Sequence, residues 1–426
     1  VSLFERNDDP RDEFAAAGRS INLALSSRGI NGLKQAGILE RIRPLLVPMR
    51  GRLVHEVDGS TEFLPYGQRE DEQIYSASRG ELNKLLLDAA DAAGNVEIHF
   101  GHAATRYDAA AQRVHVLEIE GDHDFEIETN PVIAADGAGS VIRNALHASG
   151  TIRANEIMLA HGYKELVIPA GPGGAFQLQS DALHIWPRGE FMLIALPNPG
   201  GDFTLTLFLP NEGVTSFESL HSVEEAAKFM EEQFPDAVPL INEPARSLVE
   251  NPLGFLGTVR CDHWHDAGNV LLIGDAAHAV VPFHGQGMNL AFEDCVVLTR
   301  ILDDSSADWD RVFSQYEDEQ HRNANAIADM ALENYIEMRD TVRDPKFALR
   351  KELSFELERR LPGTFIPRYS MVMFHADIPY SVAQQRGAVQ EAVLEEFTTN
   401  ATDIDQIDVD AAAAAVTAKL KPIASI

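Results

Sequence analysis

Hydrophobic residues in the first quarter of the chain repeat at helical spacing in two segments. GRSINLALSSRGINGLKQAGILERI starts extended and then becomes helical, with Ile30, Leu33 and Ile42 on one apolar side. SRGELNKLLLDAADAA predicts a second helix, because Ser78 stands at the N-cap position and a glutamate three residues later completes a capping box. The apolar residues of 290–302 keep the same spacing and indicate a third helix.

Other segments show the shorter period of extended strands. VEIHF, RVHVLEIE and FEIET predict strands, and PVIAADGAGSVIR and NVLLIGDAAHAVVPFHGQGMN predict buried strands that run into glycine-rich turns. Between 156 and 260, the runs LHIWP, FMLIAL and FTLTLFLP are broken by Pro and Gly and predict an antiparallel sheet. From Trp309 onward the pattern is helical, and the Asp- and Ala-rich tail after Thr398 is expected to be mobile or weakly helical.

The composition is that of a folded globular protein with an acidic surface. The 426-residue chain is 45% hydrophobic, and 35 Lys and Arg against 66 Asp and Glu give a formal net charge of −31. This charge repels phosphate backbones and anionic lipid, so neither nucleic acid nor a membrane is expected as a partner. No run reaches the roughly 18 apolar residues of a membrane-spanning helix, and the first residues lack signal-peptide features. Cys261 and Cys295 have neither CxxC nor metal-ligand spacing, so we expect a cytoplasmic protein without a metal site.

Two strand–turn motifs carry the candidate chemistry. Asp136 ends the first buried strand before GAGS, which places a carboxylate at the edge where open α/β sheets bind ligands. Taken alone, such an Asp-Gly pair is more often a capped tight turn. The second strand, LLIGDAAH, carries Asp275 in its turn. Further on, the GQGMN that includes Gly287 opens a helix whose free amides can face a phosphate or an electron-rich ring edge. The two motifs in this order are far more specific than either alone.

The acid that ends the opening segment VSLFE fits the same scheme. In dinucleotide-binding folds such an acid follows a GxGxxG turn by about 20 residues and binds the ribose hydroxyls. Glu5 has this position, although taken alone it is a surface acid after a strand. No GxGxxG stands before it in the sequence given. We therefore expect a fragment without the first strand–turn–helix unit of about 30 residues, which binds a dinucleotide poorly.

Longer stretches connect these motifs to one family. GRSINLALSSRG, PMRGRLVHEVDG, SASRGELNKLLLDAA, LHIWPRGEFMLIALPN, GDAAHAVVPFHGQGMNLAFEDC, NYIEMRD and TFIPRYSMVMF resemble the kynurenine 3-monooxygenase family of class A FAD-dependent aromatic hydroxylases. The resemblance runs from Val1 to about Gln390, whereas other flavin hydroxylases share only the two strand–turn motifs. It implies an α/β fold with a Rossmann-like FAD-binding domain, an inserted antiparallel-sheet substrate domain and a helical region that completes the pocket. In this chain the expected ranges are 1–155 and 261–308 for the FAD-binding parts, 156–260 for the insertion and 309–426 for the helical region.

The same resemblance implies the reaction. It predicts an oxidoreductase with FAD as cofactor, NADPH and O2 as co-substrates, and the small molecule L-kynurenine as substrate. The ring would be hydroxylated at its 3-position through a C4a-hydroperoxyflavin, as in tryptophan catabolism and NAD biosynthesis. Two alternatives stay open. One is a related flavin hydroxylase of another anionic aromatic, and the other is a non-catalytic, flavin-free fragment that binds aromatic amino acids or a protein.

By resemblance, four polar residues hold the α-carboxylate of the substrate: Arg52, Tyr66, Asn334 and Tyr369. Arginine offers a planar pair of donors to a carboxylate, and Tyr and Asn add neutral hydrogen bonds. Taken alone, Arg52 would be a solvated charge and Tyr369 a core aromatic. The substrate ring needs an apolar wall, expected from Leu183, Met192, Ile194, Leu196 and Phe208, although core packing explains their alternation equally well.

The residues beside the flavin complete the expected site. Pro282, Phe283 and His284 would flank it on the substrate side, and no catalytic residue is assigned because the flavin does the chemistry. Arg79 stands at a helix start, where the dipole disfavours a cation, so an anionic partner such as the FAD pyrophosphate is favoured. On the cofactor side the resemblance implies Glu5, Ala24, Arg79, Asp136, Asp275, Gly287, Met288 and Asn289.

Overall fold

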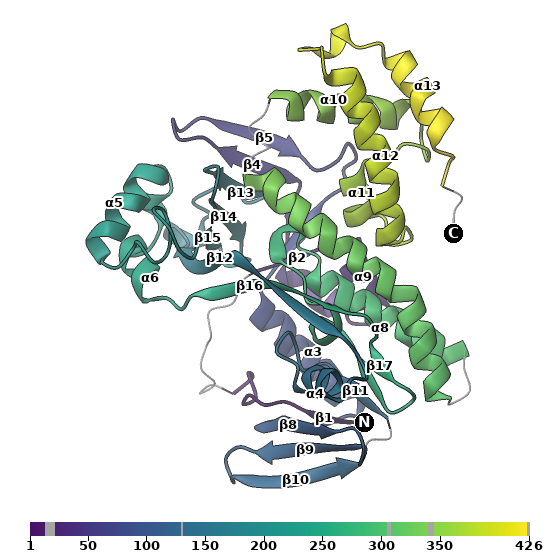
Figure 1. Ribbon diagram of the computed structural model, residues 1–426. Helices are drawn as coiled ribbons and strands as arrows, with labels where there is room; N and C mark the ends of the chain where they lie inside the picture. The colour runs from purple at the N-terminus through teal and green to yellow at the C-terminus, as the bar shows by residue number, and fades with distance from the viewer. Residues whose placement is uncertain (13–21, 129–130, 305–307, 340–344, 424–426) are drawn as a thin grey trace.

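Parallel strands with helices, a larger mixed sheet and a group of C-terminal helices make up the molecule (Figure 1). The computed structural model describes residues 1–12, 22–128, 131–304, 308–339 and 345–423. This architecture confirms the expected α/β fold class. Within the described ranges, no helix is long and apolar enough to cross a membrane.

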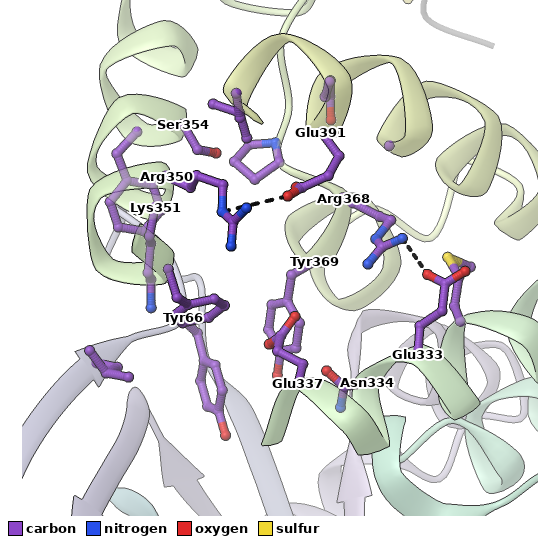
Figure 2. Close-up of a pocket in the computed structure, with 18 of the residues that line it drawn as sticks. Tyr66, Glu333, Asn334, Glu337, Arg350, Lys351, Ser354, Arg368, Tyr369 and Glu391 are labelled. Carbon is purple, nitrogen blue, oxygen red and sulfur yellow. Dashed lines mark hydrogen bonds and ion pairs between the residues drawn. The ribbon is translucent and has the colours of Figure 1, made fainter. Parts of the chain in front are cut away.

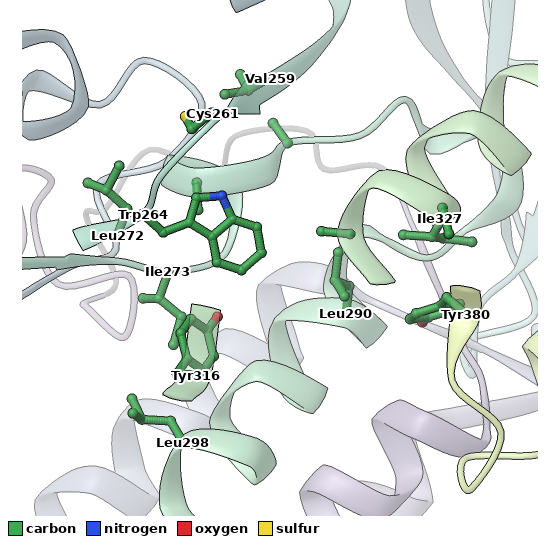
Figure 3. Packing of buried hydrophobic residues seen from close by; sticks show 14 of the residues in the cluster. Val259, Cys261, Trp264, Leu272, Ile273, Leu290, Leu298, Tyr316, Ile327 and Tyr380 are labelled. Carbon is green, nitrogen blue, oxygen red and sulfur yellow. The ribbon is translucent and has the colours of Figure 1, made fainter. Parts of the chain in front are cut away.

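The strands that precede the acidic turns pair in parallel. β1 (Ser2–Phe4) pairs with β7 (Glu97–His99), and β11 (Val132–Ala134) pairs with β18 (Val270–Leu272), which β17 (His265–Asp266) extends on its other side. β18 is fully buried, which explains its unbroken apolar sequence. Against these strands, α4 (Val141–Ser149) and α8 (Gly287–Asp304) form the largest hydrophobic cluster, together with Trp264 and Tyr316 (Figure 3).

Two smaller antiparallel sheets flank this layer. The first has the strand order β2 (Leu23–Leu25), β6 (Ile74–Ala77), β3 (Leu46–Met49). The second has the strand order β10 (His123–Glu128), β9 (Arg113–Glu118), β8 (His102–Asp108). The helix expected after LALSS is divided into α1 (Ser27–Gln35) and α2 (Leu39–Ile42), because Gly37 between them has a φ of 72°. A 3-10 turn, Arg43–Leu45, follows α2.

The helix predicted to start after Ser78 is α3 (Arg79–Ala93). The hydroxyl of Ser78 accepts a hydrogen bond from the amide of Glu81 at 3.5 Å, as expected for an N-cap. The reciprocal half of the capping box is not formed, because the carboxylate of Glu81 accepts from Lys84 Nζ at 3.1 Å instead. The start of the helix was thus predicted correctly. Of the two hydrogen bonds of the predicted capping box, only the one accepted by Ser78 is formed.

The largest sheet has seven strands and includes a segment from early in the chain. Its order is β16 (Gly254–Cys261), β12 (Ala154–Ile168), β15 (Phe203–Pro210), β14 (Met192–Pro197), β13 (Ala182–Pro187), β4 (Gly51–His55), β5 (Thr61–Pro65). Neighbouring strands are antiparallel except β13 and β4, which pair in parallel with Leu183 opposite Arg52. One face is covered by α5 (Val223–Gln233) and α6 (Pro244–Glu250), and the other contributes to the cavity described below.

The C-terminal region is helical, as predicted, but its last part is more ordered than expected. It comprises α9 (Trp309–Arg339), α10 (Pro345–Arg360), α11 (Arg368–Phe374), α12 (Tyr380–Thr398) and α13 (Val409–Lys419). The expectation of a mobile or weakly helical tail was wrong, because Ala412 and Val416 of α13 are completely buried against α10 and α12. Among the described residues, the remaining short helices are α7 (Asp275–His278) and the 3-10 turns Pro172–Gly174, Val238–Leu240, Pro282–His284 and Ile404–Gln406.

Candidate active site

A cavity of about 600 Å³ lies where the mixed sheet, the turn after β18 and the C-terminal helices meet. Its wall includes all twelve residues predicted for the substrate side: Arg52, Leu183, Tyr66, Met192, Ile194, Leu196, Phe208, Pro282, Phe283, His284, Asn334 and Tyr369. Five of the eight residues predicted for the cofactor side also line it: Ala24, Arg79, Asp275, Gly287 and Met288. The fold therefore gathers segments that lie more than 300 residues apart in the chain around one space.

The apolar part of this wall comes from adjacent strands of the mixed sheet. Met192 and Ile194 alternate on β14, so both side chains point to the cavity face of the strand. The ring of Phe208, opposite Met192 on β15, lies 4.9 Å from the ring of Phe283. Phe283 in turn stacks on Tyr335 with ring centroids 3.9 Å apart. Aromatic rings and aliphatic side chains together form an apolar wall that suits an aromatic ligand.

Next to this apolar wall, polar side chains gather around one guanidinium. Arg52 Nη1 donates to Glu337 Oε1 at 2.9 Å, and its Nη2 lies 3.4 Å from Asn334 Oδ1. Tyr66 and Tyr369 stack with centroids 5.2 Å apart, and the guanidinium carbon lies 5.2 Å from the centroid of Tyr369. Figure 2 shows Tyr66, Asn334, Glu337 and Tyr369 gathered on one side of a neighbouring cavity. The four residues predicted to form a carboxylate clamp are thus brought together.

One buried donor in this group, Arg52 Nε, has no hydrogen-bond partner among the described residues. Burial opposes the charge on Arg52, but the carboxylate of Glu337 together with Tyr369 and Tyr66 raises its pKa. Burial also raises the pKa of Tyr66, so its hydroxyl keeps its proton. A buried donor without an acceptor is costly, and a ligand that carries a carboxylate would satisfy Arg52 Nε.

His284 belongs to the turn between β18 and α8 and lies beside the polar group around Arg52. Its ring stacks on Tyr369 with centroids 5.6 Å apart. Burial, together with the nearby cations Arg368 and Arg52, lowers the pKa of His284 to about 4. The imidazole is therefore neutral at neutral pH, and its Nδ1 has no hydrogen-bond partner among the described residues.

The turn between β18 and α8 forms a cradle with little room for side chains. Gly285 has a φ of 65°, and a Cβ placed on it would lie 2.9 Å from the Cβ of Ala24. The first backbone hydrogen bond of α8 is donated by Leu290 to Gln286, which leaves the amides of Gly287 and Met288 outside the helical ladder. Both residues line the cavity, whose wall is otherwise largely apolar. The cradle fits the ring end of FAD, for which Ala24, Gly287 and Met288 would form the contacts and Arg79 and Asp275 the polar margin.

Three residues predicted for the cofactor side do not line the cavity. Glu5 accepts hydrogen bonds through its carboxylate from the amide and side chain of Asn7, at 2.8 and 2.7 Å. The carboxylate of Asp136 accepts from Val141 N at 2.8 Å, and so caps α4, while its neighbours Ala135 and Gly137 line the cavity. Asn289 is completely buried and supports the wall from behind.

Sequence reasoning missed Glu337, the partner of Arg52. It stands three residues after Asn334 in NYIEMR, so helical spacing was the available signal that both share one face of α9. Reasoning from the sequence also missed a second cavity of about 480 Å³, lined by α9 to α12, which shares Arg52, Tyr66 and Asn334 with the first. Lys351 lines this second cavity, and burial together with the charge of Arg52 lowers its pKa to about 8. Nothing in the sequence around Lys351 indicated this position.

Comparisons with known proteins agree with the fold and the cavity. A family described as FAD binding domain matches residues 10–165 and 256–331. Kynurenine 3-monooxygenase of Myxococcus xanthus is 44% identical over 99% of this chain and 90% of its own length. The enzyme of the same name from Xanthomonas axonopodis pv. citri is 45% identical over 99% of this chain and 92% of its own length.

Solved structures of more distant proteins share the fold. 2-Methyl-3-hydroxypyridine-5-carboxylic acid oxygenase superposes with a TM-score of 0.64 at 19% identity, covering 81% of this chain and 87% of the other. p-Nitrophenol 4-monooxygenase from Pseudomonas putida gives a TM-score of 0.64 at 15% identity, covering 84% of this chain and 87% of the other. The match to the FAD binding domain family and the curated relatives define the class as flavin-dependent monooxygenases, and the shared fold agrees with it. Within that class, the chain belongs to the kynurenine 3-monooxygenase family, which confirms the resemblance read from its motifs.

Proposed function

We propose that the cavity binds L-kynurenine with its α-carboxylate at Arg52 and its aromatic ring against the apolar wall beside Phe283, for hydroxylation at the 3-position. The observation that carries this proposal is the buried, unpartnered Nε donor of Arg52 beside a wall of aromatic and aliphatic side chains. A carboxylate supplies an acceptor for this donor, and the apolar wall accepts the flat ring that the same ligand carries. The names of the curated relatives support kynurenine as that ligand.

The protein's own contribution is to bind, orient and shield the substrate. FAD, when bound, supplies the oxygen-transfer chemistry, with NADPH as the source of electrons and O2 as the source of the oxygen atom. Leu183, Met192, Ile194 and Phe208 exclude water from the ring, while Arg52 beside them fixes how deep the ring can enter. The free amides of Gly287 and Met288 would hold the electron-rich edge of the cofactor ring. The cytoplasmic location suggested by the composition stays a prediction.

The role of Arg52 can be tested by pairing its substitution with a change in the ligand. Arg52→Ala should weaken binding of L-kynurenine at least about tenfold, because a charge-assisted hydrogen bond contributes roughly 1.5–3 kcal/mol. Arg52→Lys should recover part of this loss, since an ammonium cannot reproduce the planar fork. Binding is measured by isothermal titration calorimetry, with flavin content and thermal unfolding recorded for each variant.

Decarboxylated kynurenine is the matched ligand for this test. It should bind the wild type weakly and lose little further affinity in Arg52→Ala, which isolates the carboxylate contact. If both ligands lose equal affinity, Arg52 acts through general structure and the proposed clamp is wrong. Stimulation of NADPH oxidation by a salicylate-like acid, but not by L-kynurenine, would favour a hydroxylase of another anionic aromatic.

A further inference from the structure

A carboxylate stands inside the site that is proposed to receive a carboxylate. Glu337 Oε1 lies 2.9 Å from Arg52 Nη1, and the two side chains are only 27% and 8% exposed. Two negative charges around one guanidinium repel each other, and this repulsion is stronger where water is excluded. A pocket that recognised only an anionic aromatic would therefore bind its ligand more tightly without Glu337.

The position of Glu337 relative to the clamp indicates what would compensate for this repulsion. Glu337 lies one helical turn after Asn334 on α9 and lines the second cavity. Arg52, Tyr66, Asn334 and Tyr369 line both cavities, so the polar head of a ligand held by them lies at the junction. Glu337 Oε1 accepts from Arg52 Nη1, and the charge of Glu337 also acts on Lys351, which lines the same cavity. The junction thus presents cations and a carboxylate side by side.

We propose that Glu337 is the ammonium-binding half of an amino-acid clamp, so that the site selects α-amino acid zwitterions over simple aromatic acids. This inference rests on the proposed binding of the substrate carboxylate at Arg52. In kynurenine the ammonium and the carboxylate are attached to the same carbon, so a carboxylate at Arg52 brings the ammonium beside the neighbouring Glu337. The charges then alternate from Arg52 through the two ends of the substrate to Glu337, and the repulsion becomes an attraction.

A simpler role for Glu337 is that of a counter-ion that keeps Arg52 in place. The two roles predict opposite effects of Glu337→Gln. A mere counter-ion competes with the ligand, so its removal would strengthen binding of any carboxylate, with or without an ammonium. An ammonium acceptor contributes only to zwitterions, so its removal would weaken those alone.

The discriminating experiment measures two ligands that differ only in the ammonium group. L-Kynurenine and its desamino analogue, which keeps the aryl ketone and the carboxylate, are titrated calorimetrically into the wild type and the variants. We expect the wild type to prefer kynurenine by at least about tenfold, as for a charge-assisted contact. In Glu337→Gln this ratio should fall close to one, mainly through weaker binding of kynurenine. Glu337→Asp, which keeps the charge on a shorter side chain, should retain an intermediate ratio.

Glu333→Gln is the matched control, because it makes the same charge change one turn earlier on α9. Glu333 pairs with Arg368 at 2.6 Å rather than with Arg52, so the ligand ratio should stay at its wild-type value. The proposal is overturned if Glu337→Gln tightens both ligands, or if the ratio is unchanged while the variant unfolds at the wild-type temperature. Failure of the carboxylate clamp itself gives a different result: Arg52→Ala would then leave the affinity for the desamino analogue unaltered.

Discussion

At the scale of single residues, β4 carries different chemistry on its two faces. Arg52 points to the cavity, whereas His55, three residues later, lies on the opposite face of the strand. His55 Nδ1 lies 2.9 Å from Asp236 Oδ2, its Nε2 lies 2.9 Å from His184 Nδ1, and His184 Nε2 lies 2.8 Å from the carbonyl oxygen of Gln179. Because a carbonyl only accepts, a neutral His184 donates through Nε2 and accepts at Nδ1, so His55 donates to it through Nε2.

This buried chain predicts a loss of stability in mild acid. Burial, and the charge on His55, lower the pKa of His184 to about 4, compared with about 6.5 in an unfolded chain. Between these two values the unfolded chain binds a proton that the folded chain does not, so stability falls as the pH is lowered, by at most about 3 kcal/mol. His184→Gln should reduce this pH dependence, measured as urea unfolding between about pH 7 and pH 5.

The control for this prediction is His123→Gln, because the side chain of His123 is 68% exposed. Its substitution should leave the pH dependence of unfolding as in the wild type. An equally steep acid loss in His184→Gln and in the wild type would show that His184 is not its source.

At the scale of secondary structure elements, one side chain joins three of them behind the cofactor cradle. Asn289 of α8 donates to the carbonyl of Ala24 in β2 at 2.8 Å and to that of Gly285 at 2.7 Å. Its Oδ1 accepts from the amide of Ser26, next to the start of α1, at 2.9 Å. A Cβ placed on Gly29 of α1 would come within 2.4 Å of this oxygen, so the contact also requires a glycine there. The role of Asn289 is therefore to hold the cradle closed rather than to line it.

Removing this side chain should loosen the cradle. Asn289→Ala removes three hydrogen bonds to buried or partly buried backbone groups, so the free energy of unfolding should fall by about 1–3 kcal/mol. The content of bound flavin should fall with it, measured by absorbance after gel filtration. Asn31→Ala, in the neighbouring α1, should change neither quantity. Wild-type stability and flavin content in Asn289→Ala would contradict this role.

At the scale of the whole molecule, the C-terminal helices belong to the same body as the cofactor-binding strands. Arg28 of α1 is 1% exposed, pairs with Glu293 of α8, donates to the carbonyl of Val372 at 3.4 Å and lies 3.8 Å from the ring centroid of Tyr380. A buried, multiply bonded arginine is costly to disturb, so it fixes α11 and α12 against the strands that carry the cradle. The cavity wall depends on this docking, since Tyr369 comes from α11.

The overall charge predicts how the enzyme responds to salt. A net charge of −31 repels the anionic NADPH, whereas the zwitterionic kynurenine carries no net charge. Raising the ionic strength shortens the Debye length to about 8 Å at 0.15 M, so kcat/KM for NADPH should rise from low to physiological salt. The kcat/KM for kynurenine should change much less over the same range of ionic strength. If kcat/KM for NADPH falls with added salt, local cations rather than the net charge control its approach.

Local patterns in the sequence were sufficient to predict several parts of this protein. Ser78 marks the start of α3, and the apolar run before Asp275 predicts a buried strand, because caps and strand patterns depend on neighbouring residues. Motifs such as NYIEMR and GDAAH, taken together, were enough to predict the family, and all twelve residues that they indicated for the substrate side line the cavity, although Glu337 was missed. Such motifs indicate which side chains the site requires, and they can be recognised without knowing how the chain packs.

Only the tertiary structure decided how distant segments combine. No local pattern in the sequence relates the residues that meet in three such contacts. These are the pairing of Arg52 with Leu183 across two strands, the burial of Val416 in α13, and the contact between Arg52 and Glu337. Asn289 has the sequence position of a cofactor ligand, yet its neighbours in space make it a support for the cradle. The physical reason is that strand pairing, burial and the charge environment depend on which surfaces meet after folding, and the sequence of each segment specifies only its own surface.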